Sequence, residues 1–360
     1  MSSDERLPLS GVVLLEAMDA KAPAALWLAA GLCGRVAADL GATVLRIEPA
    51  EGDPLRRMPP FVGRVGAAYA FLTAGKRLIR SAQAEQMFAD LSRRATAVIL
   101  DDARYRQRTS ALAQTLPIVI GTGDDAPSSE FTVEALSGLL DLVGDPEREP
   151  LRLGGHQTAY AAGLAAFLGL IGALARNDKD KARGPVRISL LETMVWLNWK
   201  TLGLVARSGE TPTRPGATAE WLVVPCADGF VALVYRTTEW EALLSLANDA
   251  RLREDRFQSA EGRRLHAGEL NTFLSDVFSG MTRAEVREAA LKKGLPLGPV
   301  WSPQELVGDP HMQARDFFHD ALIDGIAAQM PRLPVRWNGR SFEPTAATVM
   351  SDAALREFAR

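Results

Sequence analysis

The segment VVLLEAMDAKAPAALWLAAGLCGRVAADLGATVLRIE, residues 12–48, decides the fold of this 360-residue chain. It opens with a short apolar run, Val12–Glu16, that is typical of a β-strand, and it closes with a second one, Thr43–Glu48. Between them, Ala29–Leu40 has the apolar spacing of a helix, and Gly41 fits the left-handed position that ends one. Strand, helix and strand in this order predict a parallel pair with a right-handed crossover.

The same alternation continues along the chain. Ala97–Asp101 (AVILD) and Pro117–Gly121 (PIVIG) are predicted buried strands, and the helix Ala84–Ser92 leads to the first of them. Val186–Leu191 is predicted to be another strand, followed by a helix over Glu192–Ala206. This order indicates an α/β layer with helices on both faces of a parallel sheet.

The pattern changes after residues 208–218, SGETPTRPGAT, which have the composition of a linker. Leu222–Cys226 and Phe230–Tyr235 flank Ala-Asp-Gly and predict an antiparallel hairpin. Capping boxes at Thr282–Glu285 and Ser302–Glu305 predict helix starts. We therefore expect a large α/β domain over 1–207 and 320–360, and a smaller α+β domain over 219–319.

Composition restricts the function classes. The chain has 41 basic and 44 acidic residues, a net charge of −3, and no basic cluster, so no nucleic-acid partner is expected. The apolar run Ala24–Leu32 is too short to cross a membrane, and the N-terminal residues have no signal pattern. Cys33 and Cys226 are far apart, which predicts neither a disulfide framework nor a metal site. These features favour a cytoplasmic location without a membrane partner.

The acidic residue at the end of the second strand, Glu48, raises the alternative of a dinucleotide site, where such a residue holds a ribose hydroxyl. The glycine fingerprint of that site is missing, since only Gly31 and Gly34 lie near the helix start. A strand-end carboxylate in solvent is the stronger interpretation of Glu48.

Several motifs, taken in order, point to a family. They are PLSGVVLLE and CGRVAADLGATVLRIEPAEGDPLRR within 8–57, FLTAGKR at 71–77, RGPVRISLLET at 183–193, PCADGFVALV at 225–234 and GLPLGPVWSPQELVGDPHMQARDFF at 294–318. Each motif is weak alone, but the ordered set resembles the family III CoA-transferases, the CaiB/BaiF family.

The resemblance implies a fold and a chemistry. The fold is a Rossmann-like large domain built from both chain ends, with a small middle domain, in an interlocked dimer. Coenzyme A or an acyl-CoA would bind against the large domain, and no permanently bound cofactor or metal is implied. In the family, an aspartate attacks the acyl-CoA to give a mixed anhydride, which divides one difficult exchange into easier steps.

This chain departs from the family at its chemical centre. In PLRLGGHQTAYAAGLAAFLGLIG, residues 150–172, the catalytic aspartate of the family aligns with Ala159. The histidine that the racemase branch pairs with this aspartate aligns with Ser129. The loop Gly121–Phe131 is shortened, and Thr73-Ala74 replaces the usual Asn-Arg. These changes together predict a remodelled site without its nucleophile.

Other residues are candidates for parts of that site. Glu130 and His156 are weak substitutes for the missing catalytic group. Trp196 and Trp199, at helical spacing, indicate core or interface positions. The residues that we expect near coenzyme A are the phosphate-pairing Lys76 and Arg77 and the strand-end residues Glu48, Asp102, Arg104 and Gly121.

The leading hypothesis is a non-catalytic subunit of a heteromeric CoA-transferase, or a degenerate acyl-CoA binder. The chain would pair with itself or with a related chain that keeps the aspartate. One alternative is an active enzyme on CoA thioesters (a transferase, a racemase or isomerase, or a lyase) with relocated chemistry. Another is a structural or regulatory protein that no longer binds coenzyme A.

Overall fold

The computed structural model describes residues 7–80, 82–123, 129–176, 184–210, 214, 221–343 and 345–360. The chain divides into two compact units, each of which is described by itself. The larger unit comprises Met1–Val143, Leu151–Pro212 and Ala314–Arg360, and the smaller comprises Gly144–Pro150 and Thr213–Gln313. The larger unit is therefore built from both ends of the chain.

A seven-stranded sheet organises the larger unit, in the order β16-β5-β2-β1-β6-β7-β8. All neighbouring strands pair in parallel, so the predicted α/β fold with a parallel sheet is confirmed. The strands are β1 (Val13–Glu16), β2 (Thr43–Ile47), β5 (Arg77–Ile79), β6 (Ala97–Asp101), β7 (Leu116–Gly121), β8 (Val186–Ser189) and β16 (Thr348–Val349).

Alternate side chains of the strands enter two separate cores. Leu14, Val44 and Ile99 pack with α1 (Ala24–Asp39) and α6 (Gln157–Ala175). Their chain neighbours Leu15, Leu45 and Val98 pack on the opposite face with α3 (Phe88–Arg94) and α15 (Asp352–Ala359). Because successive strand residues point to opposite faces, strands that are apolar throughout predict this two-sided burial.

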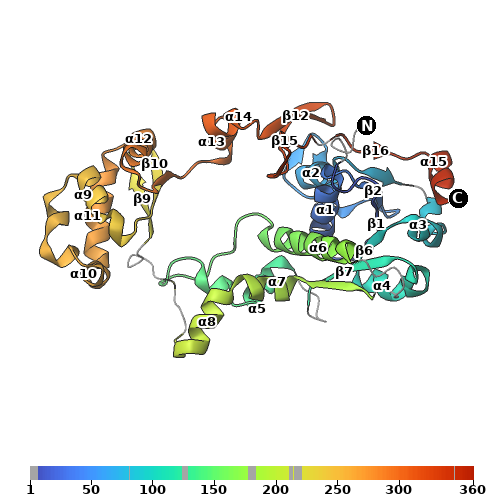
Figure 1. Ribbon diagram of the computed structural model, residues 1–360, viewed down its shortest axis with the longest axis horizontal. Helices are drawn as coiled ribbons and strands as arrows, with labels where there is room; N and C mark the ends of the chain where they lie inside the picture. Colours follow the sequence, from blue (N-terminus) through green and yellow to red (C-terminus); the bar gives the residue numbers. More distant parts are fainter. Residues whose placement is uncertain are drawn as a thin grey trace. The chain divides into compact units, whose positions relative to one another are not determined.

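The helices α1 and α6 lie against each other on one face of the sheet (Figure 1). The buried side of α6 consists of Ala159, Ala162, Ala166 and Leu170, whereas Leu164 and Leu168 are exposed. Within the described residues α6 is the one helix long and apolar enough to cross a membrane, by length and composition alone. The core helix of a soluble protein can pass the same test, and α6 packs against α1.

Several predicted boundaries are wrong: the helix expected over Ala84–Ser92 begins at Phe88, and the helix expected over Ala29–Leu40 begins at Ala24. The strand expected over Val186–Leu191 ends at Ser189, because the Ser189 hydroxyl accepts from the Glu192 N–H at 3.0 Å and starts a helix. The single helix expected over Glu192–Ala206 is two, α7 (Leu190–Leu197) and α8 (Trp199–Ser208), which meet at Asn198.

Shorter elements complete the larger unit. The helices are α2 (Ala67–Thr73), α4 (Asp102–Arg108) and α5 (Glu130–Leu136). Three two-stranded antiparallel pairs are present: β3 (Phe61–Val62) with β4 (Val65–Gly66), β12 (Phe318–Ile323) with β13 (Ile326–Pro331), and β14 (Arg336–Trp337) with β15 (Arg340–Ser341).

The smaller unit has a three-stranded antiparallel sheet, formed by β9 (Leu222–Cys226), β10 (Gly229–Leu233) and β11 (Gly298–Pro299). The predicted capping boxes start α12 and α13, with Thr282 and Ser302 as the cap residues. The helices are α9 (Trp240–Ala247), α10 (Ala260–Leu265), α11 (Ala267–Ser279), α12 (Arg283–Lys293), α13 (Pro303–Val307) and α14 (Pro310–Ala314), the last of which ends at the unit boundary.

Candidate functional site

The start of α6 holds Ala159, the residue at the predicted catalytic position. Ala159 is the third residue of the helix, and its side chain is fully buried. Its backbone N–H donates to Oε1 of Glu130 at 3.0 Å. N–H groups in a first helical turn have no partner within their helix, so a carboxylate from another element satisfies one of them. The carboxylate also lies at the positive end of the helix dipole.

Glu130 reaches this position because α5 begins at it. The Ser129 hydroxyl accepts from the Thr132 N–H at 3.2 Å and fixes the start of α5. Oε2 of Glu130 lies 2.6 Å from Nδ1 of His156, and the Glu130 side chain is almost wholly buried. The structure thus brings together Ala159 and both predicted substitutes, Glu130 and His156.

A second carboxylate lies one turn further along α5. Oε1 of Glu134 accepts from the Thr158 hydroxyl at 3.1 Å. Glu134 is 1% exposed, and its Oε2 has no hydrogen-bond partner among the described residues. The start of α6 is therefore flanked by two buried carboxylates of one helix, where the family would place a single reactive one.

Tyr160 follows Ala159 and borders the same cluster. Its ring meets that of His156 edge to face, with centroids 6.2 Å apart. Burial, and secondarily the charge of Glu130, raises the pKa of the Tyr160 phenol. The phenol is thus held in its neutral form.

Lys76, a predicted phosphate contact, is in the interior of the protein. Its ammonium donates to Oε1 of Glu16 and, at 2.8 Å, to the backbone oxygen of Gly31. Glu16 also binds Nη1 of Arg46 at 2.6 Å, and Arg46 binds Asp53 at 2.7 Å. All four charged side chains are buried, so the ammonium of Lys76 does not face a ligand in this structure.

Burial and the charge of Glu16 shift the pKa of Lys76 in opposite directions. Desolvation lowers its pKa to about 8, and the attraction of Glu16 only partly offsets it. The neighbouring predicted residue, Arg77, is exposed as the first residue of β5 and makes no ion pair within the described part of the chain. Of the two predicted phosphate contacts, Arg77 is the accessible one.

Glu48 binds two arginines that line a cavity. Its Oε1 accepts from Arg56 at 3.2 Å and from the Tyr69 hydroxyl, and its Oε2 accepts from Arg80 at 2.9 Å. Arg56 also stacks over the Tyr69 ring at 4.3 Å. One buried carboxylate thus holds two partly exposed guanidinium groups in place.

The cavity beside these arginines has a volume of about 470 Å³, within the range of small-molecule sites. Arg56 and Arg80 line it together with Tyr69, and His319 contributes from β12. Burial lowers the pKa of His319, so its imidazole is neutral at pH 7. Of the predicted ligand residues, Glu48 thus acts here as the support for two cations and not as a solvated carboxylate.

The three remaining predicted residues lie at the carboxyl ends of β6 and β7. Asp102 accepts from Nη1 of Arg187 at 2.7 Å. A Cβ at Gly121 would lie 2.2 Å from Oδ2 of Asp102, so a larger residue there would displace this carboxylate. Arg104 is mostly buried and pairs with Glu85. The structure brings Asp102 and Gly121 together, but each charged group here already has a partner.

The arginines Arg56 and Arg80, and the second carboxylate Glu134, were not predicted. Arg56 lies two residues after the Gly-Asp-Pro turn, and Arg80 directly follows the strand after Lys76-Arg77. A basic residue just past a strand end is the signal that identifies Arg80. Among the described residues no group of three or more His, Cys, Asp or Glu side chains could hold a metal ion.

The fold and the site together define a class: a doubly wound α/β protein with a cavity lined by two arginines and a buried helix start bordered by carboxylates. The family model for CoA-transferase family III matches residues 9–110 and 120–348. The chain therefore belongs to CoA-transferase family III, and the resemblance inferred from the motifs is confirmed.

Relatives agree with this assignment. The chain is similar to succinate–glutarate CoA-transferase of Agrobacterium fabrum, with 27% identity over 91% of this chain and 89% of the relative. It is 26% identical to the alpha subunit of succinyl-CoA–L-malate CoA-transferase of Chloroflexus aurantiacus, over 90% of this chain and 81% of the relative. A CAIB/BAIF family protein from Brucella suis shares the fold, with a TM-score of 0.81, 21% identity and coverage of 99% and 100%.

Proposed function

We propose that this protein takes part in CoA transfer as a subunit without a nucleophile, which binds a CoA thioester beside a related chain that carries the aspartate. The observation that carries the proposal is the buried methyl group of Ala159 at the start of α6. A methyl group cannot form an acyl anhydride, and the nearest carboxylate, Glu130, is engaged on both oxygens.

Binding of the thioester is supported by the cavity that Arg56 and Arg80 line. Coenzyme A carries phosphates, and guanidinium groups pair with phosphate through two parallel hydrogen bonds. Glu48 and Tyr69 hold both guanidinium groups in place before a ligand arrives, which lowers the entropic cost of binding.

Pairing with another chain is supported by the exposed apolar side chains of α6, α7 and α8. Leu168, Trp196 and Trp199 are about 70% exposed, and large apolar patches on soluble proteins mark interaction sites. One relative is named as an alpha subunit, which is consistent with unequal chains in this family. The interlocked arrangement of such a pair remains a prediction.

The experiment compares this chain alone, a related chain with the aspartate alone, and both together, in an assay that exchanges CoA between two acids. We expect no turnover by this chain alone, and a higher rate or a changed acid preference for the mixture. Thermal unfolding with coenzyme A tests binding separately, since a ligand of the native state raises the unfolding temperature. Turnover by this chain alone contradicts the proposal, and no shift at saturating CoA favours a protein that no longer binds it.

A second candidate function rests on the distance of 3.0 Å between Glu130 Oε1 and the Ala159 nitrogen. Glu130 is the carboxylate nearest to the place of the missing nucleophile. In this mechanism it attacks the thioester carbonyl, the carbon–sulfur bond breaks, CoA leaves as the thiolate, and a mixed anhydride forms on Glu130. Treatment with acyl-CoA and hydroxylamine, followed by mass mapping, tests this route. A hydroxamate on Glu130, absent in Glu130→Gln, would establish it.

A further inference from the structure

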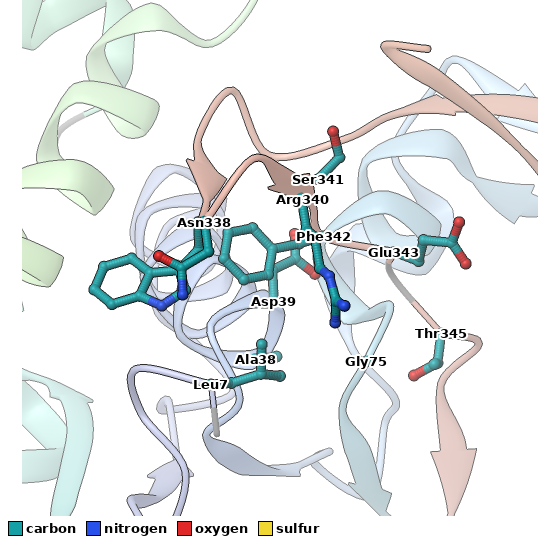
Figure 2. Close-up of a pocket in the computed structure, with 11 residues that line it drawn as sticks. Leu7, Ala38, Asp39, Gly75, Asn338, Arg340, Ser341, Phe342, Glu343 and Thr345 are labelled. Carbon is teal, nitrogen blue, oxygen red and sulfur yellow. The ribbon is translucent and has the colours of Figure 1, made fainter. Parts of the chain in front are cut away.

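A second cavity, of about 570 Å³, lies in the larger unit away from α5 and α6. Its walls come from the end of α1, Gly75 before β5, the hairpin of β14 and β15, and the residues Phe342, Glu343 and Thr345 (Figure 2). None of the residues at the start of α6 lines it, and it does not include Arg56 or Arg80. It shares Thr345 with the proposed CoA-binding cavity, but its other lining residues are different.

The hairpin of β14 and β15 supplies two of the lining side chains. Trp337 and Arg340 are paired directly across it. Asn338 and Gly339 between them have φ values of 50° and 76°, which are typical of the tight turns that join such strands. Directly opposed residues project to the same face of a hairpin, so the indole of Trp337 and the guanidinium of Arg340 are presented together.

The cavity combines an apolar wall with one guanidinium, that of Arg340. Asp39 is bound by Arg35 at 3.0 Å, whereas the exposed Glu343 shares Arg332 with Asp316. The guanidinium of Arg340 has no hydrogen bond or ion pair with any residue that the structure describes, and Figure 2 shows it extending away from the hairpin towards Gly75. The apolar surface comes from Leu7, Ala38, Trp337 and Phe342.

We propose that this cavity binds a small aromatic carboxylic acid. A planar ring covers the half-exposed indole of Trp337, while the carboxylate takes the two parallel N–H donors of Arg340. The hydroxyls of Ser341 and Thr345 also line the cavity and can donate to a carboxylate oxygen. A free guanidinium beside an apolar wall selects an anion with an apolar body over inorganic anions, which have nothing to place against the indole.

The test is calorimetric titration of the full chain with benzoate, with its neutral isostere benzamide, and with inorganic phosphate. We expect saturable benzoate binding with a dissociation constant of about 1 mM or tighter, and binding of benzamide and phosphate about tenfold or more weaker. Arg340→Gln is expected to weaken benzoate about tenfold and to remove the preference over benzamide. Trp337→Leu should weaken benzoate and benzamide alike.

Arg94→Gln is the matched control, because Arg94 is also an exposed arginine and lies on α3. It should leave benzoate binding unchanged. Arg340 is exposed, so Arg340→Gln should unfold at the wild-type temperature, which separates lost binding from lost folding. Benzoate binding that is equally tight in Arg340→Gln, or no saturation up to about 10 mM, would overturn the proposal.

Discussion

The backbone N–H of Ala159 donates a hydrogen bond to Oε1 of Glu130 at 3.0 Å. This bond places a carboxylate at the helix start where the sequence motifs predict the family's reactive aspartate, but on a different helix and with both oxygens engaged. It links Ala159, whose methyl group cannot react, to Glu130, whose two carboxylate oxygens are both held by hydrogen bonds.

Restoring the nucleophile should conflict with this carboxylate. Ala159→Asp adds a buried charge next to Glu130, and we expect a loss of about 3 kcal/mol or more of unfolding free energy at pH 8. Repulsion raises the pKa of the new carboxyl in the folded state, so the folded protein holds an extra proton and the loss should be smaller at pH 5.

Glu130→Gln in the same background should recover a large part of that loss at pH 8, as measured by urea denaturation. Gln157→Asp, at the exposed first position of α6, is the control and should change stability little. If Ala159→Asp lowers the free energy of unfolding equally with and without Glu130→Gln, the two carboxylates do not interact.

Removing the Glu130 carboxylate, which accepts the N–H of Ala159 from another helix, should by itself destabilise the protein. Glu130→Ala leaves the N–H of Ala159 without an acceptor and is expected to cost about 1–3 kcal/mol. Glu130→Gln keeps an acceptor oxygen and should cost less. Glu51→Ala, at an exposed position, serves as the control in the same denaturation series; a cost for Glu130→Ala no larger than this control would contradict the assigned role.

The lowered pKa of Lys76 predicts that the free energy of unfolding depends on pH. Its pKa is about 8 in the folded protein, compared with the ordinary 10.5. Between these values the unfolded chain holds a proton that the folded chain has lost, so the unfolding free energy should rise with pH, by up to about 1.4 kcal/mol per pH unit. Lys76→Met should lack this rise from pH 8 to 10, whereas Lys292→Met, at an exposed ion pair, should keep it. Parallel curves for all three proteins would contradict the shift.

Arg80 should contribute to CoA binding if the cavity of about 470 Å³ is the site. Arg80→Gln removes one guanidinium but leaves Glu48 its contact with Arg56, so the protein should fold and bind CoA roughly tenfold more weakly. Arg94→Gln should not change the affinity. Titration calorimetry at low and high salt checks both, because an ionic contact weakens with salt.

The exposed tryptophans predict an association surface. The double variant Trp196→Ser/Trp199→Ser should raise the dissociation constant for assembly with a second chain about tenfold or more in sedimentation experiments. It should leave the unfolding temperature of the isolated chain nearly unchanged. Trp221→Ser removes an equally exposed tryptophan from the smaller unit and is the control. An unchanged dissociation constant in the double variant would exclude this surface.

The strands and helix starts were predictable because their causes are local. The apolar run Ala97–Asp101 and the capping boxes at Thr282 and Ser302 lie where they were expected. The predicted strand Val186–Leu191 extended too far because the Ser189 side chain offers the backbone a helix cap, which competes with further strand pairing.

Side-chain partners from distant segments were not predictable in the same way. Lys76 had the residue type of a phosphate contact, but Glu16, 60 residues earlier in the chain, binds it in the interior. Glu48 had the position of a ligand residue, but it holds Arg56 and Arg80 instead. These outcomes depend on which charges meet when the sheet assembles.

The sequence by itself determined the order of strands and helices and the family, since these depend on local periodicity and on residue identity, and it predicted that Ala159 occupies the catalytic position. Only the tertiary structure decided that Glu130 reaches Ala159, that Lys76 is withdrawn from solvent, and that Arg340 lies free beside an apolar cavity. The physical reason is that burial and pairing of charges depend on contacts between segments far apart in the chain, and the energy of each charge depends on the dielectric environment that those contacts create.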